Sequence, residues 1–545
     1  MTAIVDIETD GFKNEATQIH CIVAKCSKTN TIKKWVQEEC KDFKDWSKNV
    51  HSYAMHNGLS FDAPLLNKFT GSSIEPNQIR DTLIESQLFN PIREEGHGLS
   101  AWGKKLKFEK GDMNSFHSYS PDMLTYCTQD VNLTHKVMDE LDKEKVKFSN
   151  ESIELEKKVR VIIDKQEENG FTLDLRKAMT LKASLEDEAN NLVNEATEIF
   201  PPAEVQLKTK VKYIPFNIGS RKQIAERLIK KGWKPKLKTD KGNVIVNEEV
   251  LNNIDMKEAK MFSRYLLLQK RVSQIKSWIE LCDDDNKVHG RVMTLKTITG
   301  RMAHNSPNLA QVPAIYSPYG KECRDCWTVS DSSKYTLVGT DASGLELRCL
   351  AHYMNSDVFT NELLTGDIHT ANMKAAGLTN RDQAKTFIYA FLYGAGAAKI
   401  GKVVGAGPKE GQKLVDKFLS NLPELADLRT EVQEASVQGV IKGLDGRVFQ
   451  IRSPHSALNT LLQGAGAIVC KQWLVSMIEM ITASGIDAHL VASVHDEYQF
   501  EVNHRDVQKF GQISKESIKQ TEQILKLNCP LDSEWKAGLT WAATH

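Results

Sequence analysis

The sequence has no excess of either charge, because 71 Lys and Arg residues balance 71 Asp and Glu residues in 545. Phosphate neutralisation supplies most nonspecific affinity for nucleic acid, so such binding would have to depend on local basic segments. Ten cysteines are scattered along the chain, and only Cys323 and Cys326 form a C-x-x-C pair. A zinc site or a disulfide framework would need further cysteines or histidines at suitable spacing, so we interpret this pair as structural or incidental.

Long apolar runs, internal repeats and low-complexity tracts are also lacking. No apolar run approaches the roughly 18 residues that suggest a membrane span, so we expect no membrane partner. The chain leads directly into a predicted strand, without the features of a secretory signal. Its length of 545 residues and hydrophobic content of 41% predict a large multidomain enzyme with substantial hydrophobic cores. We expect this enzyme in the cytoplasm.

Two acidic motifs are the most informative part of the sequence. The apolar run 335–340 predicts a strand that delivers Asp341 to its end, and Ala342 offers only a backbone carbonyl. Residues 488–494 and 498–502 predict a hairpin with His495, Asp496 and Glu497 at its tip. Two Mg²⁺ ions about 3.5–4 Å apart, held by such carboxylates, can support phosphoryl transfer. An isolated His-Asp-Glu motif is more typical of a solvated turn, so this prediction depends on the rest of the chain.

A predicted helix over residues 380–396 lies between these motifs. Arg381, Lys385, Tyr389 and Tyr393 stand four residues apart and form one stripe. Two cations followed by two aromatic rings suit a nucleoside triphosphate, with the cations on the phosphates and the rings on sugar and base. An aromatic stripe taken alone is more typical of a core.

A second group of acids opens the chain. A strand beginning at Thr2 would project Asp6 and Glu8 from one face, and Asp62 follows another strand-like segment. Asp130 lies on a helix predicted to be capped by Ser120, with Tyr126 one turn earlier. Each acid alone could be a surface residue. Four carboxylates are costly to gather unless cations neutralise them, so the set predicts a second metal site.

Together with the segments 299–313 and 452–463, these motifs resemble the family A (polymerase I type) DNA polymerases, in the family's order and over nearly the whole chain. Among the family, the sequence motifs most resemble those of the phage replicative members. The resemblance implies an α/β (α+β) fold with an RNase H-like 3′–5′ exonuclease domain at 1–150 and a right-hand polymerase domain at 151–545. Within the polymerase domain it implies a thumb at about 151–285, a palm at about 286–354 and 448–545, and fingers at about 355–447.

The resemblance also assigns roles to individual residues. For polymerisation, it implies Asp341, Asp496 and the Ala342 carbonyl as metal ligands, with Glu497 beside them. Arg381, Lys385 and His369 would bind the incoming phosphates, and Tyr389 and Tyr393 would lie at the nucleotide. Glu346 would block a 2′-hydroxyl. Arg301, Asn459, Gln463 and His495 would contact DNA, the first three at the minor groove. For excision, it implies Asp6, Glu8, Asp62 and Asp130 as metal ligands and Tyr126 as the residue that orients water. Each site would use two Mg²⁺ ions, with Mn²⁺ as a substitute.

Primer-template DNA and deoxynucleoside triphosphates are the partners that the resemblance implies, with a phage helicase-primase and a single-strand-binding protein as further candidates in a bacterial host. Residues 208–241 hold twelve Lys or Arg residues against two acids, which favours phosphate contact over a merely solvated face. Thioredoxin is not expected, because the link 200–215 is too short for the thumb insertion that captures it in phage relatives. A family A repair polymerase stays the main alternative. A single-subunit RNA polymerase and a non-catalytic binding remnant are disfavoured by Glu346 and by the two complete acid sets.

Overall fold

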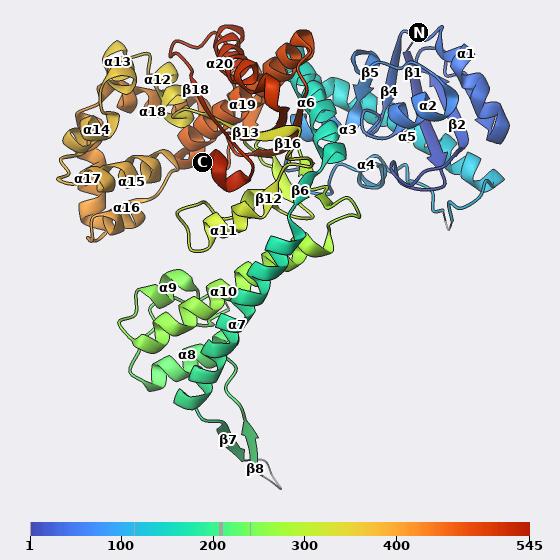
Figure 1. The fold of residues 1–545 in the computed structure, drawn as a ribbon. Coiled ribbons are helices and arrows are strands. Elements are labelled where there is room, and N and C mark those ends of the chain that lie inside the picture. The colour runs from blue at the N-terminus through green and yellow to red at the C-terminus, as the bar shows by residue number, and fades with distance from the viewer. Residues whose placement is uncertain (1, 114, 207–210, 240) are drawn as a thin grey trace. The chain divides into compact units, whose positions relative to one another are not determined.

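The computed structural model describes residues 2–113, 115–206, 211–239 and 241–545 (Figure 1). Contacts divide the chain into two compact units. The first unit is Met1–Asn169, Val292–His304 and Thr340–Trp535, and the second is Gly170–Arg291, Asn305–Gly339 and Lys536–His545. Helix α6 (Asn150–Asn169) therefore packs with the first unit, although the sequence predicted that the thumb begins near residue 151. Lys208, Lys210 and Asp240 of the predicted basic segment lie outside the described residues.

The amino-terminal part of the first unit is an RNase H-like α/β fold. Its five-stranded sheet has the order β3-β2-β1-β4-β5, with β1 antiparallel to β2 and parallel to β4. Alternate residues of β1 face opposite sides, as strand geometry requires. Ile4 packs with Cys127 and Val131 on one side, while Ala3 and its alternates join the larger core on the other. The strands are β1 (Thr2–Thr9), β2 (Ile19–Cys26), β3 (Ile32–Val36), β4 (Ser52–Met55) and β5 (Ile79–Asp81).

Helices cover this sheet. Ser120 caps α5 by accepting a hydrogen bond from the Met123 backbone N–H at 3.2 Å, and Pro121 is the first helical residue, as predicted. Strand β1 begins at Thr2, as predicted, and includes Asp6 and Glu8. The helices are α1 (Phe43–Ser47), α2 (Asp62–Thr70), α3 (Thr82–Phe89), α4 (Leu99–Leu106), α5 (Pro121–Lys145) and α6 (Asn150–Asn169).

A four-stranded sheet of order β16-β17-β13-β18 forms the palm. Strands β16 (Ala488–Val494) and β17 (Glu497–Asn503) form the predicted hairpin, in which Val494 pairs with Glu497 and His495 has a φ of 58°. Strand β13 (Tyr335–Ala342) ends in the predicted acidic motif, and β18 (Ser533–Gly538) flanks it. Trp473 of α19 (Ala457–Ser484) packs on Tyr498, and Phe510 of α20 (Val507–Ile524) packs on Phe500.

The segment between these palm strands is mostly helical and carries the predicted nucleotide-binding helix. Helix α15 (Arg381–Leu392) is shorter than the predicted range 380–396, because Asn380 caps it and the chain leaves helical geometry at Tyr393. The other elements are α12 (Leu345–Met354), α13 (Asp357–Thr365), α14 (Ile368–Ala376), α16 (Ala397–Val403), α17 (Pro408–Ser420), α18 (Pro423–Ala435), β14 (Val440–Lys442) and β15 (Val448–Gln450).

The second unit is built around the long helices α7 (Leu175–Ile199) and α10 (Lys257–Glu280), which pack along each other (Figure 1). Phe200, Phe216 and Phe262 form its apolar centre with ring centroids 5.0–5.6 Å apart. Ser220 caps α8 of the predicted basic segment. The remaining elements of this unit are β6 (Phe171–Leu173), β7 (Ala203–Gln206), β8 (Val211–Ile214), α8 (Arg221–Lys230), α9 (Glu248–Asn252), β9 (Lys287–Val288), α11 (Gly320–Asp325) and β12 (Trp327–Thr328). Strands β10 (Arg291–Met293) and β11 (Ala303–Asn305) pair with each other and lie mostly within the Val292–His304 segment of the first unit.

Residues 454–484, which include α19, are long and apolar enough to cross a membrane by length and composition alone. The sequence prediction concerned an uninterrupted apolar run, and this helix contains Lys471 and Glu479. Within the fold, 83% of the most apolar window is buried. A core helix of a folded protein passes the same test, and the burial of Trp473, Leu474 and Met477 identifies α19 as such a helix.

Candidate active sites

The palm sheet brings the two predicted acidic motifs together. The backbone N–H of Ala342 donates to the carbonyl oxygen of Asp496 at 3.2 Å, so the end of β13 lies against the tip of the β16–β17 hairpin. Burial and the nearby charges of Asp496, Glu497, Glu534 and Glu346 raise the pKa of Asp341 to about 8. Burial and the charge of Glu346 also raise the pKa of Asp496, which His495 and Arg301 partly oppose. Carboxylates that repel one another in this way fit a site for divalent cations.

Glu346 is held in place by two neighbours. Its Oε1 accepts hydrogen bonds from the hydroxyl of Tyr393 at 3.1 Å and from Nη2 of Arg301 at 3.3 Å. Glu346 lies on α12, Tyr393 is the residue after α15, and Arg301 lies in the segment after β10. Asn459 and Gln463, both predicted to contact the minor groove, lie one turn apart on α19 and contact each other. The Nε2 of Gln463 donates to Oδ1 of Asn459 at 2.8 Å.

Helix α15 carries the aromatic and basic stripe. The ring of Tyr389 lies 6.3 Å from that of Tyr393 and 6.3 Å from that of His369 on α14, measured between centroids. Burial, followed by the charges of Glu346 and Asp496, raises the pKa of Tyr389. Arg381 makes an ion pair with Asp367, the cap of α14, at 2.8 Å, and Lys385 is exposed. The stripe therefore connects the acidic cluster with an accessible basic surface.

The RNase H-like sheet assembles the second acid set. Asp6 and Glu8 extend from β1, Asp62 begins α2, and Asp130 and Tyr126 lie on α5. Burial, followed by the charges of Glu8, Asp62 and Asp130, raises the pKa of Asp6. Burial raises the pKa of Glu8 to about 9 with help from Asp130, and that of Asp62 to about 8 with help from Asp81. Like the palm cluster, this set fits divalent cations.

Three residues beside these clusters were not predicted from the sequence. Lys110 makes an ion pair with Asp130 Oδ2 at 2.8 Å, and its ammonium lies 4.9 Å from the ring centre of Tyr126. The Cys127 thiol donates to the backbone oxygen of Asp6 at 3.3 Å and to its Oδ2 at 3.4 Å. Glu534 of β18 adds a further acid to the palm cluster. Of these, Cys127 could have been anticipated, because it lies three residues before Asp130 and so shares its helix face.

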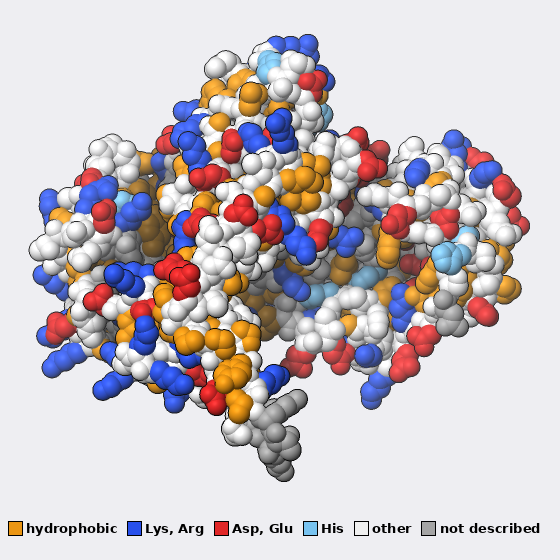
Figure 2. Space-filling model, turned by 60° about the horizontal axis from the view of Figure 1, so that its bottom comes forward, with side chains coloured by type: hydrophobic (Ala, Val, Ile, Leu, Met, Phe, Trp, Pro, Cys, Tyr) orange, Lys and Arg blue, Asp and Glu red, His pale blue; other side chains and the backbone are white. Residues whose placement is uncertain are grey.

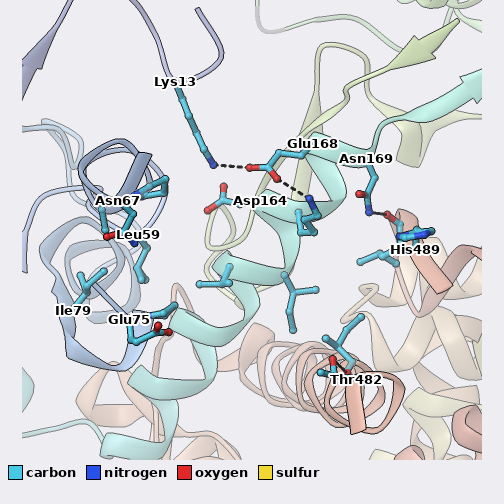
Figure 3. Close-up of a pocket in the computed structure, with 18 of the residues that line it drawn as sticks. Lys13, Leu59, Asn67, Glu75, Ile79, Asp164, Glu168, Asn169, Thr482 and His489 are labelled. Carbon is cyan, nitrogen blue, oxygen red and sulfur yellow. Dashed lines mark hydrogen bonds and ion pairs between the residues drawn. The ribbon is translucent and has the colours of Figure 1, made fainter. Parts of the chain in front are cut away.

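The acid clusters are distinct from the pocket shown in Figure 3. That pocket has a volume of about 580 Å³ and is lined by residues of α2, α6, α19 and β16, none of which is a predicted site residue. At one side Lys13 and Lys165 bind Glu168 at 2.9 and 3.1 Å. On the molecular face in Figure 2, Lys and Arg side chains lie interspersed with Asp and Glu, in keeping with the net charge of zero.

The fold agrees with comparisons to known proteins. The sequence model of DNA polymerase family A matches residues 177–543. The chain therefore belongs to this family of DNA-directed DNA polymerases, whose members use divalent metal ions. It is 30% identical to the DNA-directed DNA polymerase of Escherichia phage T7, across 99% of this chain and 100% of that protein.

Two bacterial proteins extend the comparison. DNA polymerase I of Bacillus subtilis (strain 168) is 28% identical over 60% of this chain and 40% of its own length. The solved structure described as "POL domain of Pol1 from M. smegmatis complex with DNA primer-template and dNTP" has a TM-score of 0.83 at 17% identity. The match covers 99% of this chain and 95% of that one. The predicted fold class, an RNase H-like domain with a right-hand polymerase domain, is thereby confirmed.

Proposed function

We propose that this chain extends a DNA primer at the palm cluster and excises mismatched primer ends at the RNase H-like cluster. The observation that carries the polymerase assignment is the contact of Ala342 with Asp496, which places Asp341 among four other carboxylates in a chain of this family. Two Mg²⁺ ions held there, with Mn²⁺ as a substitute, would activate the primer 3′-hydroxyl and stabilise the leaving pyrophosphate. Asp341, Asp496 and the Ala342 carbonyl are the proposed ligands.

The other residues of the palm and of α15 position the substrate. Arg381, Lys385 and His369 bind the triphosphate, for which Arg381 must exchange its ion pair with Asp367. Tyr389 stacks on the sugar, and Glu346 occupies the space that a ribose 2′-hydroxyl would need. Tyr393 and Arg301 hold Glu346 in that position through hydrogen bonds of 3.1 and 3.3 Å. Asn459, Gln463, Arg301 and His495 contact the primer end. Catalysis then depends on positioning and on fixed charges.

Excision is proposed for the amino-terminal cluster. Asp6, Glu8, Asp62 and Asp130 are the proposed ligands of a second pair of ions, and Tyr126 orients the attacking water. The support is that burial raises the pKa of all four acids, and that neighbouring acids raise the pKa values of Asp6, Glu8 and Asp62 further. A frayed mismatched end would be cut here, which suits replication of a phage genome in the cytoplasm of a bacterial host.

Primer extension by the purified chain tests both assignments. A labelled primer on a long single-stranded template, with Mg²⁺ and deoxynucleotides, should be extended by the wild type and by Asp6→Ala but not by Asp496→Ala. A primer with a mismatched end and no deoxynucleotides should be shortened by the wild type and by Asp496→Ala but not by Asp6→Ala. Extension by Asp496→Ala would refute the palm assignment, and shortening by Asp6→Ala would refute the excision assignment.

The same assay tests the partners. The alignment with the phage T7 relative runs over 705 positions, whereas this chain has 545 residues, so the relative carries segments that this chain lacks. The hairpin formed by β7 and β8 occupies the link before α8. We propose that the chain works without thioredoxin and with a phage helicase-primase and single-strand-binding protein. Longer products on addition of thioredoxin would contradict the first part, and unchanged products with the latter two proteins would contradict the second.

A further inference from the structure

Asp367 occupies the guanidinium group of Arg381 with both of its carboxylate oxygens. Nε of Arg381 donates to Oδ2 of Asp367 at 2.8 Å, and Nη2 of Arg381 donates to Oδ1 at 3.0 Å. This fork-like pairing is also the way in which a guanidinium group binds a phosphate. Both side chains are about half exposed, so an anion can reach the pair from solvent.

The carboxylate of Asp367 is held in place by the start of α14. It accepts hydrogen bonds from the backbone N–H groups of His369 at 3.1 Å and Thr370 at 3.3 Å, and from the Thr370 hydroxyl at 2.8 Å. Its own backbone N–H donates to Oε1 of Glu362 at 3.0 Å. Most exposed ion pairs contribute little, because two side chains must be ordered to form them. Here the capping bonds already order the acid, so the pair retains more of its attraction.

The negative charge of Asp367 is permanent at neutral pH. Hydrogen bonds from Arg381 and Thr370 hold the pKa of Asp367 below its ordinary value of 3.8. Its carboxylate therefore neutralises one of the two cations that α15 offers to a triphosphate, and Lys385 is the other.

We propose that Asp367 competes with the incoming triphosphate for Arg381. It thereby weakens nucleotide binding and speeds the release of pyrophosphate, because the carboxylate returns to the guanidinium group as the phosphates leave. This role rests on the function proposed above, in which Arg381 binds the triphosphate. Asp367 acts through Arg381 and is a positioning residue, with no contact to the reacting atoms.

Asp367→Asn removes the charge and keeps the cap, because Asn and Asp cap helices about equally well. In single-nucleotide incorporation on a primer-template, the KM for the deoxynucleotide should fall by about two- to fivefold, the range that an exposed ion pair gives. The kcat should not rise, and pyrophosphate should inhibit at a concentration lower by a similar factor. A merely structural defect in α14 would raise the KM instead.

Two further variants separate the pair from its charge and its fold. Asp382→Asn removes an equal charge from the first turn of α15, where Asp382 acts on Arg381 by charge without a hydrogen bond. It should change both constants by less than half as much as Asp367→Asn does. Asp367→Ser keeps a capping oxygen and should behave like Asp367→Asn. Equal effects of Asp367→Asn and Asp382→Asn would overturn the inference.

A double variant tests whether Asp367 acts through Arg381. In an Arg381→Gln background, Asp367→Asn should leave the KM nearly unchanged, because the group for which the carboxylate competes is gone. The same decrease in KM with and without Arg381 would contradict the proposed competition. An unchanged or higher KM in the single variant Asp367→Asn would do so as well.

Binding of inorganic tripolyphosphate to the chain without DNA separates this inference from the proposed function. Calorimetry at low salt should show tighter binding by Asp367→Asn than by the wild type, and weaker binding by Arg381→Gln. Tighter binding by Asp367→Asn together with no primer extension by the wild type would refute the polymerase function and support the competition. Normal extension by the wild type with equal tripolyphosphate affinity in Asp367→Asn would overturn only the competition.

Discussion

The two acid clusters differ in what surrounds their carboxylates. In the RNase H-like cluster the chain supplies an ammonium group, from Lys110, within 2.8 Å of Asp130, and a thiol within 3.4 Å of Asp6. In the palm, Arg301 binds Glu346 at 3.3 Å, and the charges of four acids raise the pKa of Asp341. The first cluster is partly neutralised by its own neighbours, so we infer that the second depends more strongly on a bound cation.

The largest effects are expected when one cluster at a time is inactivated by mutation. Asp341→Asn should reduce primer extension by about 10³-fold or more, because it removes a fixed charge from the reacting centre. Mismatch excision should stay unchanged. Asp62→Asn should reduce mismatch excision and leave primer extension unchanged. The rates of extension and of excision, measured on one labelled primer, check both variants. If either variant loses both activities while its circular dichroism is unchanged, the clusters do not act separately.

A buried charge cluster joins α6 to Arg447 and to α19. Glu156 of α6 is 0% exposed and binds Arg447 and Lys471 at 2.7 Å. Glu156→Gln would leave two buried cations without their shared partner, so the free energy of unfolding should fall by about 3–5 kcal/mol. Urea denaturation measures this change.

The matched control for that variant is Glu479→Gln. Glu479 binds Lys158 at 2.8 Å, but both side chains are more than half exposed. An exposed pair of this kind contributes about 0–1 kcal/mol. Equal losses in the two variants would show that burial of Glu156 is not what makes its ion pairs important.

A smaller effect is expected from Tyr393→Phe. This change removes the hydroxyl that donates to Glu346 at 3.1 Å and leaves the ring in place. A hydrogen bond to a charged group contributes about 1.5–3 kcal/mol, so discrimination between deoxynucleotides and ribonucleotides should weaken by about tenfold. Single-nucleotide incorporation rates check this. Unchanged discrimination would mean that Arg301 alone orients Glu346.

The smallest expected effect is a change of stability with pH that depends on the charge of Asp341 in the palm cluster. The folded pKa of Asp341, about 8, lies above its ordinary value of 3.8, so the folded state holds the proton more tightly than the unfolded state. Stability of the metal-free chain should therefore fall as pH rises from about 4 to about 8. The thermal midpoint should decrease by a few degrees over that range.

Two additions test the origin of that slope. Mg²⁺ should raise the midpoint more at pH 8 than at pH 5, because more carboxylate charge is then available to bind it. Asp341→Asn should flatten the slope. A midpoint that rises with pH in the metal-free wild type would contradict the inferred charge repulsion.

The sequence predicted those parts of the sites that follow from local geometry. The hairpin with Asp496 at its tip and the start of α5 at Pro121 were predicted correctly, because strand alternation and helix capping depend on neighbouring residues. The end of α15 at Leu392 was missed, since the four-residue spacing continues to Tyr393 although the helix does not.

Contacts made through tertiary structure were beyond that reasoning. Lys110 lies on a segment without helix or strand periodicity, and only the folded chain brings it to Asp130. Glu534 reaches Asp341 through the order of strands in the palm sheet. Sequence reasoning had no means to predict either neighbour.

The burial of Glu156 has a consequence for synthesis on the ribosome. Its partner Arg447 lies 291 residues later in the chain. At about 5–20 residues per second, α6 emerges about 15–60 s before this partner has been translated. During that interval the nascent amino-terminal region has a carboxylate that cannot yet be neutralised as in the finished protein. Its folding is thus completed only after most of the message has been read.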